Sequence, residues 1–206
     1  MLWFASRALR MPSEQPFVLV IAGGTASGKS SIVSRFVAAT GAAHLSHDRY
    51  YFDVPEPRGY DFDHPDALDT DRLVADLECL KRGESAELPV YSFASHSRSG
   101  DTETMHPTPV IVVEGILVLA DARLADLADL TVFVDAPEPV RFDRRLRRDM
   151  AERGRTEESV RTQYAETVKP NHERFVQPSK ALASVVLDGT VDLDQSVDKL
   201  VSLVVR

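Results

Sequence analysis

Short runs of apolar, often β-branched residues alternate along the chain with stretches in which apolar residues recur at helical spacing. This alternation is typical of a parallel sheet that carries helices on both faces. Five runs have the length and composition of buried strands, at residues 17–22, 43–46, 110–113, 131–135 and 184–187. The hydrophobic pattern therefore predicts an α/β fold of three layers with a five-stranded parallel sheet in the middle.

Three amphipathic stretches mark helices that should pack on this sheet. The second ends near Gly83, and the third is a closing helix at the end of the sequence. Their apolar positions are Ile32, Val33, Phe36 and Val37 in the first, Leu73, Leu77 and Leu80 in the second, and Leu193, Val197, Leu200, Val201 and Val204 in the third.

Two regions depart from the alternation. Residues 88–106 contain two short runs on either side of a polar turn at residues 97–100, which predicts a projecting β-hairpin. Residues 137–167 are helical in pattern but rich in charge, and Arg153-Gly154-Arg155 interrupts them like a hinge, which favours a helical lid. We expect both to belong to a single domain at residues 17–206, after a flexible leader at residues 1–16.

Charge and cysteine content limit the partners of the protein. The 32 acidic residues outnumber the 24 basic ones, and a net charge of -8 would repel a polyanion such as a nucleic acid. The single cysteine, Cys79, cannot form an internal disulfide, and no apolar run is long enough to span a bilayer. The first ten residues place apolar residues before charge, the reverse of a secretory signal. We therefore expect a cytoplasmic protein that acts on a small molecule.

A phosphate-binding motif directly follows the first predicted strand. Residues 23–30 satisfy G-x-x-x-x-G-K-[ST], and helical periodicity begins at once after them. Glycines let backbone N–H groups point into the loop, Lys29 can reach the β- and γ-phosphates, and Ser30 offers a hydroxyl to Mg²⁺. The alternative is a glycine-rich turn with an incidental lysine. The nucleotide-binding residues predicted here are Gly23, Gly24, Thr25, Ala26, Ser27, Gly28, Lys29, Ser30 and Ser31.

The motif alone does not separate a kinase from a GTPase or a motor ATPase. The guanine-reading Asn-Lys-x-Asp tetrad of GTPases is absent from the sequence. A small-molecule kinase needs a group that orients the acceptor hydroxyl, and Asp48 at the end of the second predicted strand can face the phosphates. A turn or helix-capping role is the alternative for Asp48.

A kinase also needs cations over the transferring phosphoryl group. Seven arginines lie within fifteen residues of this acidic chain, and Arg144 and Arg148 share a helix face. The alternatives are a solvated helix face paired with acidic neighbours and an RNA-binding arginine helix. The seven are Arg141, Arg144, Arg145, Arg147, Arg148, Arg153 and Arg155.

Several motifs in this order resemble the uridine kinase (uridine-cytidine kinase) family of P-loop kinases, over about residues 17–180. The resemblance implies the three-layer P-loop kinase fold and transfer of the γ-phosphate of ATP, or GTP, to the 5′-hydroxyl of a pyrimidine ribonucleoside. The matching segments include Gly23-Gly-Thr-Ala-Ser-Gly-Lys-Ser30, Asp48-Arg-Tyr-Tyr51, Phe62-Asp-His-Pro-Asp-Ala67, Pro89-Val-Tyr-Ser-Phe93, Ser95-His-Ser-Arg98, Glu114-Gly-Ile-Leu117, Arg144-Arg-Leu-Arg-Arg-Asp149 and Glu152-Arg-Gly-Arg155.

The resemblance also implies a role for each matching residue. Asp48 would accept the proton of the 5′-hydroxyl, Asp63 would bind the ribose hydroxyls, and Glu114 would hold Mg²⁺ together with Ser30. On pattern alone, Asp135 competes with Glu114 for the metal. Lys29, Arg148 and Arg153 would contact the transferring phosphates. The remaining substrate-binding residues implied are Tyr51, Phe62, Tyr91, Phe93, His96, Arg145, Arg155 and Gln163.

The chain also departs from the family pattern. The stretch between Tyr51 and Phe62 is shorter than usual, Asp61 stands where asparagine is typical, and the loop at residues 188–190 lacks the customary Pro-Arg-Gly. Two rivals stay open, a phosphoribulokinase-like or pantothenate-kinase-like enzyme and a non-catalytic nucleotide sensor. The resemblance further implies a homo-oligomer, a tetramer, which no residue pattern shows.

Overall fold

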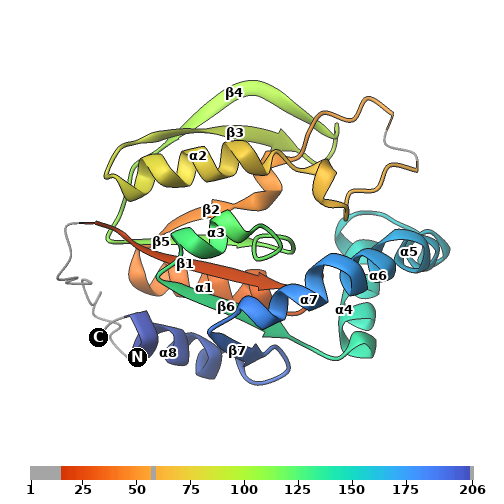
Figure 1. Cartoon of the computed structure of the whole chain (residues 1–206). Helices are drawn as coiled ribbons and strands as arrows, with labels where there is room; N and C mark the ends of the chain where they lie inside the picture. The colour runs from red at the N-terminus through yellow and green to blue at the C-terminus, as the bar shows by residue number, and fades with distance from the viewer. Residues whose placement is uncertain (1–14, 57–58, 205–206) are drawn as a thin grey trace, which may run out of the picture.

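Five parallel strands form the central sheet of the computed structural model, which describes residues 15–56 and 59–204 (Figure 1). The order across the sheet is β2-β5-β1-β6-β7, so the predicted five-stranded parallel sheet is confirmed. Most of the predicted leader, residues 1–14, lies outside the described residues. The strands are β1 (Phe17–Gly23), β2 (Ala43–Ser46), β5 (Val110–Gly115), β6 (Leu130–Asp135) and β7 (Val185–Asp188).

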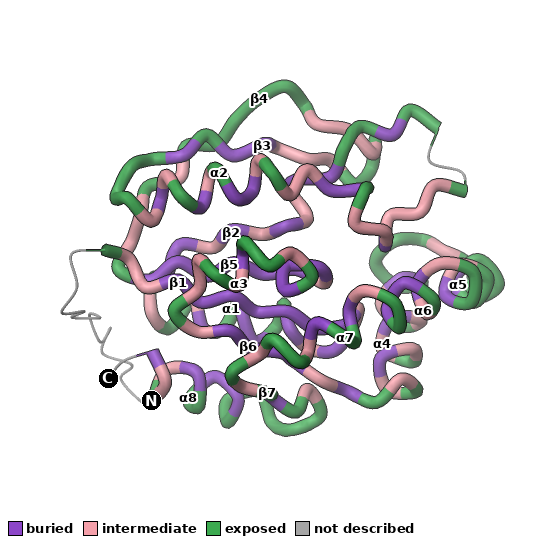
Figure 2. Tube along the Cα trace, viewed as in Figure 1, coloured by how far each residue is buried: buried purple, intermediate pink, exposed green. Residues whose placement is uncertain are grey.

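Helices cover both faces of the sheet because alternate residues of the central strand point to opposite sides. Leu19 and Ile21 pack with α1 (Lys29–Thr40) and α8 (Leu193–Val204) in one fully buried cluster. Val18 and Val20 pack on the other face, against α2 (Thr70–Lys81) and α3 (Ala122–Leu127). The three predicted amphipathic helices are therefore α1, α2 and α8, and Figure 2 shows the buried strands between their exposed outer faces.

The hairpin forms a separate antiparallel pair of strands, and α2 lies between this pair and the main sheet (Figure 1). Its strands are β3 (Ala86–Ser92) and β4 (Ser97–Met105). The predicted turn at residues 97–100 is wrong, because the chain reverses at residues 93–96 and Ser97 already pairs with Ser92. His96 takes the left-handed conformation in this turn, at φ 51°. The sequence pattern did not indicate this, because Gly100 gave the stronger turn signal.

The charged region folds as α4 (Glu138–Glu152) and α5 (Glu157–Gln163), with a break where Arg153-Gly154-Arg155 predicted one. Gly154 has φ 62°, and the Thr156 hydroxyl caps α5 by accepting a hydrogen bond from the Ser159 N–H. Helical structure continues beyond residue 167 to residue 182. Its further segments are η3 (Tyr164–Val168), α6 (Lys169–Asn171), η4 (His172–Val176), α7 (Gln177–Ser179) and η5 (Lys180–Leu182).

Parallel strand ends bring the predicted site residues together at one edge of the sheet. Ser46 at the end of β2 and Ile21 of β1 both align with Glu114 of β5. Two short 3-10 helices follow on this side, η1 (His47–Tyr50) and η2 (Pro65–Ala67). Within the described ranges, the helices are too short or too polar to cross a bilayer.

Gly189, directly after β7, lies against the phosphate-binding loop. A Cβ atom at this position would come within 2.0 Å of the Ser27 carbonyl oxygen and 3.1 Å of the Asp135 carbonyl oxygen. The Gly189 N–H also donates a 2.6 Å hydrogen bond to that Asp135 oxygen, so the backbone has little room to withdraw.

We therefore predict that Gly189→Ala displaces the loop and lowers both stability and nucleotide affinity. Overpacking of this kind costs about 1–3 kcal/mol. Urea unfolding and titration with a fluorescent ADP analogue measure the two effects. Gly100→Ala is the control for nucleotide affinity: no atom lies within 4 Å of its would-be Cβ, and its φ of +82° lets an alanine lower stability without touching the loop. Equal nucleotide affinity in the two variants would contradict the prediction.

Candidate functional site

One cavity of about 1330 Å³ opens at the strand ends and is lined by nearly all of the predicted site residues. The structure brings together residues from the loop after β1, the segment after β2, the hairpin and the α4–α5 region, as the sequence predicted. Of the predicted residues, Gly23, Glu114, Arg141 and Arg147 do not line it. The predicted residues in its wall beyond the phosphate loop are Asp48, Tyr51, Phe62, Asp63, Tyr91, Phe93, His96, Arg144, Arg145, Arg148, Arg153, Arg155 and Gln163.

The phosphate loop has the backbone shape that an anion cradle requires. Gly28 has φ 104°, and Ala26 is one of only two described non-glycine residues with positive φ. The first turn of α1 has no side-chain cap at Gly28, so its N–H groups stay available to a phosphate. Gly24 leaves no space for a side chain, because a Cβ there would lie 2.8 Å from the His172 ring.

Lys29 and Glu114 form a buried ion pair beside this loop. Burial raises the pKa of the Glu114 carboxyl, but the Lys29 ammonium outweighs this effect and the net pKa is lowered. Glu114 is therefore a carboxylate at neutral pH. Asp135, its competitor on pattern, contacts Lys180 at 2.6 Å and not the lysine of the phosphate loop.

Asp48 follows β2 directly and sits in η1, facing the cavity. Burial raises its pKa, while the Lys29 ammonium opposes that rise. Glu114 raises the pKa of Asp48 further, and the guanidinium groups of Arg153 and Arg148 lower it. Asp48 therefore lies within the electrostatic reach of the phosphate-loop lysine and of two arginines from the far side of the cavity.

Aromatic side chains form a cluster next to Asp48. The Tyr51 ring centroid lies 5.8 Å from that of Phe62 and 5.4 Å from that of Tyr91. Phe93 packs edge-on against Tyr91, and His96 lies over Phe62 with centroids 4.9 Å apart. The buried Tyr91 hydroxyl has no hydrogen-bond partner among the described residues. The cluster thus offers flat apolar surface and one unpaired polar group.

Asp63 is buried at the border between this aromatic cluster and the arginines. Burial raises the pKa of Asp63, and the Arg145 guanidinium opposes the rise. The preceding carboxylate, Asp61, accepts hydrogen bonds from the Asp63 N–H at 3.1 Å and from the Asn171 amide at 2.8 and 2.6 Å. Asp61, which departs from the family pattern, therefore orders the loop that presents Asp63.

Arg98 anchors the hairpin to the body of the protein, a role that sequence reasoning missed. Its guanidinium donates to the carbonyl oxygens of Tyr50 and Tyr51, both at 3.0 Å, and contacts Asp69 at 3.2 Å. The Val54 N–H donates to the His96 carbonyl oxygen nearby. These contacts fix the hairpin tip over the segment that carries Asp48. The Ser-His-Ser-Arg motif was the available signal.

Most arginines of α4 turn inward rather than to solvent. Arg141 is buried behind the phosphate loop, Arg144 donates to the Gly189 carbonyl oxygen at 2.9 Å, and Arg145 donates to the Thr25 hydroxyl at 3.0 Å. Arg147 alone of the helix fits the solvated alternative, since it is 78% exposed and pairs with Asp143. A nucleic-acid-binding helix would present its arginines outward, so this arrangement argues against that alternative.

The structure adds residues to the cavity that the sequence did not single out. Val191 and Leu193 are exposed apolar residues at the end near Gly189, and Ile32 and the buried Ser196 lie with them. Leu193 was predicted only as a residue of the closing helix. No local pattern marks a shelf assembled from two such distant segments.

The residues at the phosphate loop suit a magnesium ion bound jointly with phosphate. Across the described ranges, no cluster of three or more His, Cys, Asp or Glu side chains could hold a metal by itself. Magnesium commonly takes one or two carboxylates plus substrate phosphates and water. Ser30 is exposed at the loop, and the ionised Glu114 pairs with the adjacent loop residue Lys29, so the hydroxyl and carboxylate oxygens that such an ion takes are both present.

Comparison with known proteins agrees with this geometry. The family model described as "Phosphoribulokinase / Uridine kinase family" matches residues 18–195. A uridine kinase of Chloroflexus aurantiacus is 46% identical over 185 residues, covering 86% of this chain and 88% of that protein. A uridine kinase of Lactococcus lactis subsp. cremoris is 42% identical over 203 residues, covering 92% and 98%.

Solved structures support the fold. The phosphoribulokinase of Rhodobacter spheroides superimposes with a TM-score of 0.61 at 15% identity, over 87% of this chain and 74% of that one. At this identity the likeness concerns the fold alone, whereas the sequence matches cover nearly the whole described chain. On the strength of those matches, the protein belongs to the phosphoribulokinase / uridine kinase family.

Proposed function

We propose that this enzyme transfers the γ-phosphate of ATP to the 5′-hydroxyl of uridine or cytidine, giving UMP or CMP. One observation carries the proposal: a single cavity joins the phosphate loop, the Asp48 carboxylate and a cluster of aromatic rings. The uridine kinase relatives, up to 46% identical, support the same substrate class.

The donor nucleotide would lie along the phosphate loop. The N–H groups at the start of α1 and the Lys29 ammonium would bind the β- and γ-phosphates. Val191 and Leu193 offer an apolar shelf at the end of the cavity where the donor base would rest. Mg²⁺ held by Ser30 and Glu114 would supply charge neutralisation for the phosphates.

The nucleoside would occupy the other end. Its pyrimidine ring would lie against the aromatic cluster that includes Phe62 and Phe93, with His96 and the unpaired Tyr91 hydroxyl available to its polar edge. Asp63 would accept hydrogen bonds from the ribose hydroxyls. A deoxyribonucleoside would leave that buried carboxylate without one partner, which disfavours it as a substrate.

The transfer step needs positioning and charge more than covalent chemistry. The 5′-oxygen forms a bond to the γ-phosphorus while the bond from that phosphorus to the β–γ bridging oxygen breaks, and ADP leaves. Asp48 orients the attacking hydroxyl and takes its proton late, because an alcohol is a weak acid and the transition state is loose. Arg148 and Arg153 stabilise the charge on the moving phosphoryl group.

The two rivals fit the cavity less well. A sugar-phosphate acceptor would need cations at the acceptor end, where aromatic rings lie instead. A nucleotide sensor would not need Asp48 next to the phosphate loop. We further propose a homo-oligomer, a tetramer, on family resemblance alone, and a cytoplasmic location on the composition of the chain.

A panel of acceptors tests the proposal directly. We expect ADP release to accelerate with uridine and cytidine, and much less with deoxyuridine, deoxycytidine, adenosine, pantothenate or ribulose 5-phosphate. A coupled assay that follows ADP measures all of them under one condition. Failure of both pyrimidine ribonucleosides to accelerate ADP release would refute the proposed function.

Asp48→Asn should lower kcat by about 10²–10⁴-fold while ATP affinity stays nearly unchanged, because the variant loses only the proton acceptor. In the wild type, the acid limb of kcat should lie above the range of an ordinary aspartate, since burial raises the pKa of Asp48. Steady-state kinetics across pH and ATP titration measure both. Near-normal turnover in the variant would eliminate Asp48 from this role.

His96→Ala should impair discrimination among bases more than ATP affinity. The ring lies over Phe62 in the cavity, so its loss removes a contact specific to the nucleoside. A change of about tenfold in relative kcat/KM between uridine and cytidine is in the range of one such contact. His106→Ala is the control, because His106 is exposed beyond the cavity wall and bonds only Ser85. Identical base preference in both variants would contradict the role.

A further inference from the structure

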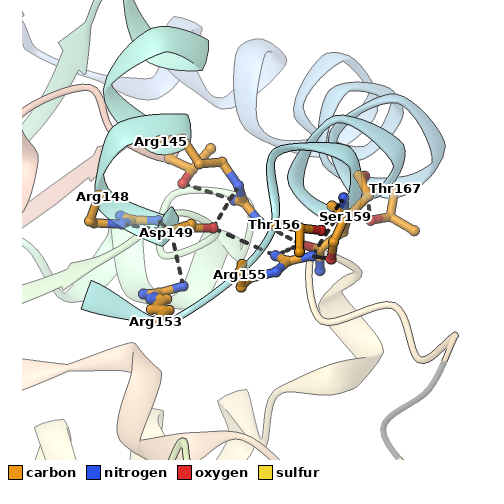
Figure 3. Close-up of polar contacts among 10 residues, drawn as sticks. Arg145, Arg148, Asp149, Arg153, Arg155, Thr156, Ser159 and Thr167 are labelled. Carbon is orange, nitrogen blue, oxygen red and sulfur yellow. Dashed lines mark hydrogen bonds and ion pairs between the residues drawn. The ribbon is translucent and has the colours of Figure 1, made fainter. Parts of the chain in front are cut away.

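Asp149 is a completely buried carboxylate at the centre of the arginine group, with 0% exposure (Figure 3). On the solvated alternative, Asp149 is one of the acidic neighbours that pair with arginines on an exposed helix face. The structure instead surrounds it with the guanidinium groups of Arg145, Arg148, Arg153 and Arg155.

The two oxygens of Asp149 divide these arginines between them. Arg148 donates twice to Oδ1, at 2.9 and 2.8 Å, and Arg153 lies 3.6 Å from the same atom. Oδ2 lies 3.5 Å from Arg145 and 3.6 Å from Arg155, and forms no hydrogen bond within the described part of the chain. One carboxylate thus faces four cations.

The backbone of Asp149 also brings two of these arginines back toward its side chain. Its carbonyl oxygen accepts hydrogen bonds from the N–H groups of Arg153 at 3.3 Å and Arg155 at 3.1 Å. These bonds end α4 and turn the chain at Gly154, so residues beyond the helix face a residue within it. The break between α4 and α5 is therefore built around Asp149.

The arginines held in this way reach the rest of the site. Arg145 connects to the phosphate loop through Thr25 and to Gln163 at 3.0 Å, and Arg155 also contacts Gln163. All four arginines line the cavity, whereas Asp149 does not. Asp149 therefore reaches the cavity through the arginines that it contacts, and its negative charge also raises the pKa of Asp63.

Mutual repulsion makes this arrangement depend on the carboxylate. Arg145 is buried, whereas Arg148, Arg153 and Arg155 are partly exposed at their cavity side, and the four guanidinium groups repel each other around the buried Asp149 carboxylate. One negative charge at their centre offsets part of that repulsion. The cluster keeps a net positive charge, which the negative charge of a bound phosphate group can neutralise. Without Asp149, we expect the exposed ends of Arg148 and Arg153 to move apart into solvent.

We propose that Asp149 is a positioning residue that preassembles Arg145, Arg148, Arg153 and Arg155 for phosphoryl transfer. The inference rests on the proposed function. Asp149 itself contacts neither nucleotide nor nucleoside, so its effect should fall on the chemical step, where an error of about 1 Å in placement can cost about 10²-fold. Substrate binding should change less.

The test compares Asp149→Asn with Asp143→Asn. Both changes remove an aspartate that pairs with an arginine at i, i+4 on α4, but Asp143 is exposed and remote from the cavity. We expect Asp149→Asn to lower kcat about 10–100-fold with KM changed less than about fivefold, and Asp143→Asn to match the wild type. Equal kcat in the two variants would overturn the proposal.

Salt dependence separates positioning from a general loss of structure. At saturating substrates, raising KCl should restore part of kcat in Asp149→Asn, because salt screens the repulsion among the arginines. It should not do so in the wild type or in Asp143→Asn. A folded Asp149→Asn variant, by circular dichroism, whose low kcat does not respond to salt would contradict the proposal.

Asp149→Glu keeps the negative charge and provides a second variant for the test. We expect it to retain kcat within about tenfold of the wild type, and a folded Glu variant that is as slow as Asn would overturn the proposal. Failure of both variants to fold would overturn it too, since stability would then be the role of Asp149. Should the wild type phosphorylate no nucleoside, the proposed function fails, and basal ATP hydrolysis gives the same comparison of variants.

Discussion

The buried contact between the Lys29 ammonium and the Glu114 carboxylate is the interaction on which the site depends. A buried charge is tolerated only when a partner and hydrogen bonds compensate for lost water. Lys29 opens α1 and Glu114 ends β5, so the pair locks the phosphate loop to the sheet strand next to β1. Its presence requires the strand register in which Ile21 aligns with Glu114. The strand register of the fold and the geometry of the phosphate site therefore depend on each other.

Elsewhere around the cavity, other carboxylates are likewise buried next to cationic side chains. An acidic protein concentrates arginines around one volume, and carboxylates lie among them: Asp149 contacts four arginines, and Asp63 lies beside Arg145. Buried carboxylates next to cations are costly to leave unpaired. These carboxylates therefore hold the arginines in place before any phosphate group is bound.

Local features of the site were predictable, and features made by long-range contacts were not. The phosphate loop follows from one segment of sequence, and the sheet and amphipathic helices follow from periodicity, as Ile21 and Phe36 illustrate by their full burial. The hairpin turn was placed four residues too late, because Gly100 gave the stronger turn signal while the pairing of Ser97 with Ser92 decides the reversal. The sequence pattern favoured a solvent-exposed position for Asp149, because nothing in its neighbourhood along the chain reveals that Arg153 and Arg155 fold back toward it.

The two ends of the cavity differ in how they are held, and this difference has a consequence for specificity. The phosphate end is built from backbone and from the central strands, so side-chain changes there are limited by packing against Gly23, Gly24 and Gly189. Part of the aromatic end lies on the hairpin, outside the main sheet. Arg98 fixes this hairpin to the body of the protein through two backbone carbonyl oxygens and Asp69. Substitutions in the hairpin can therefore reshape the acceptor pocket without disturbing the sheet. Such separation explains how one scaffold can serve kinases with different acceptors, since donor chemistry and acceptor choice depend on different parts of the chain.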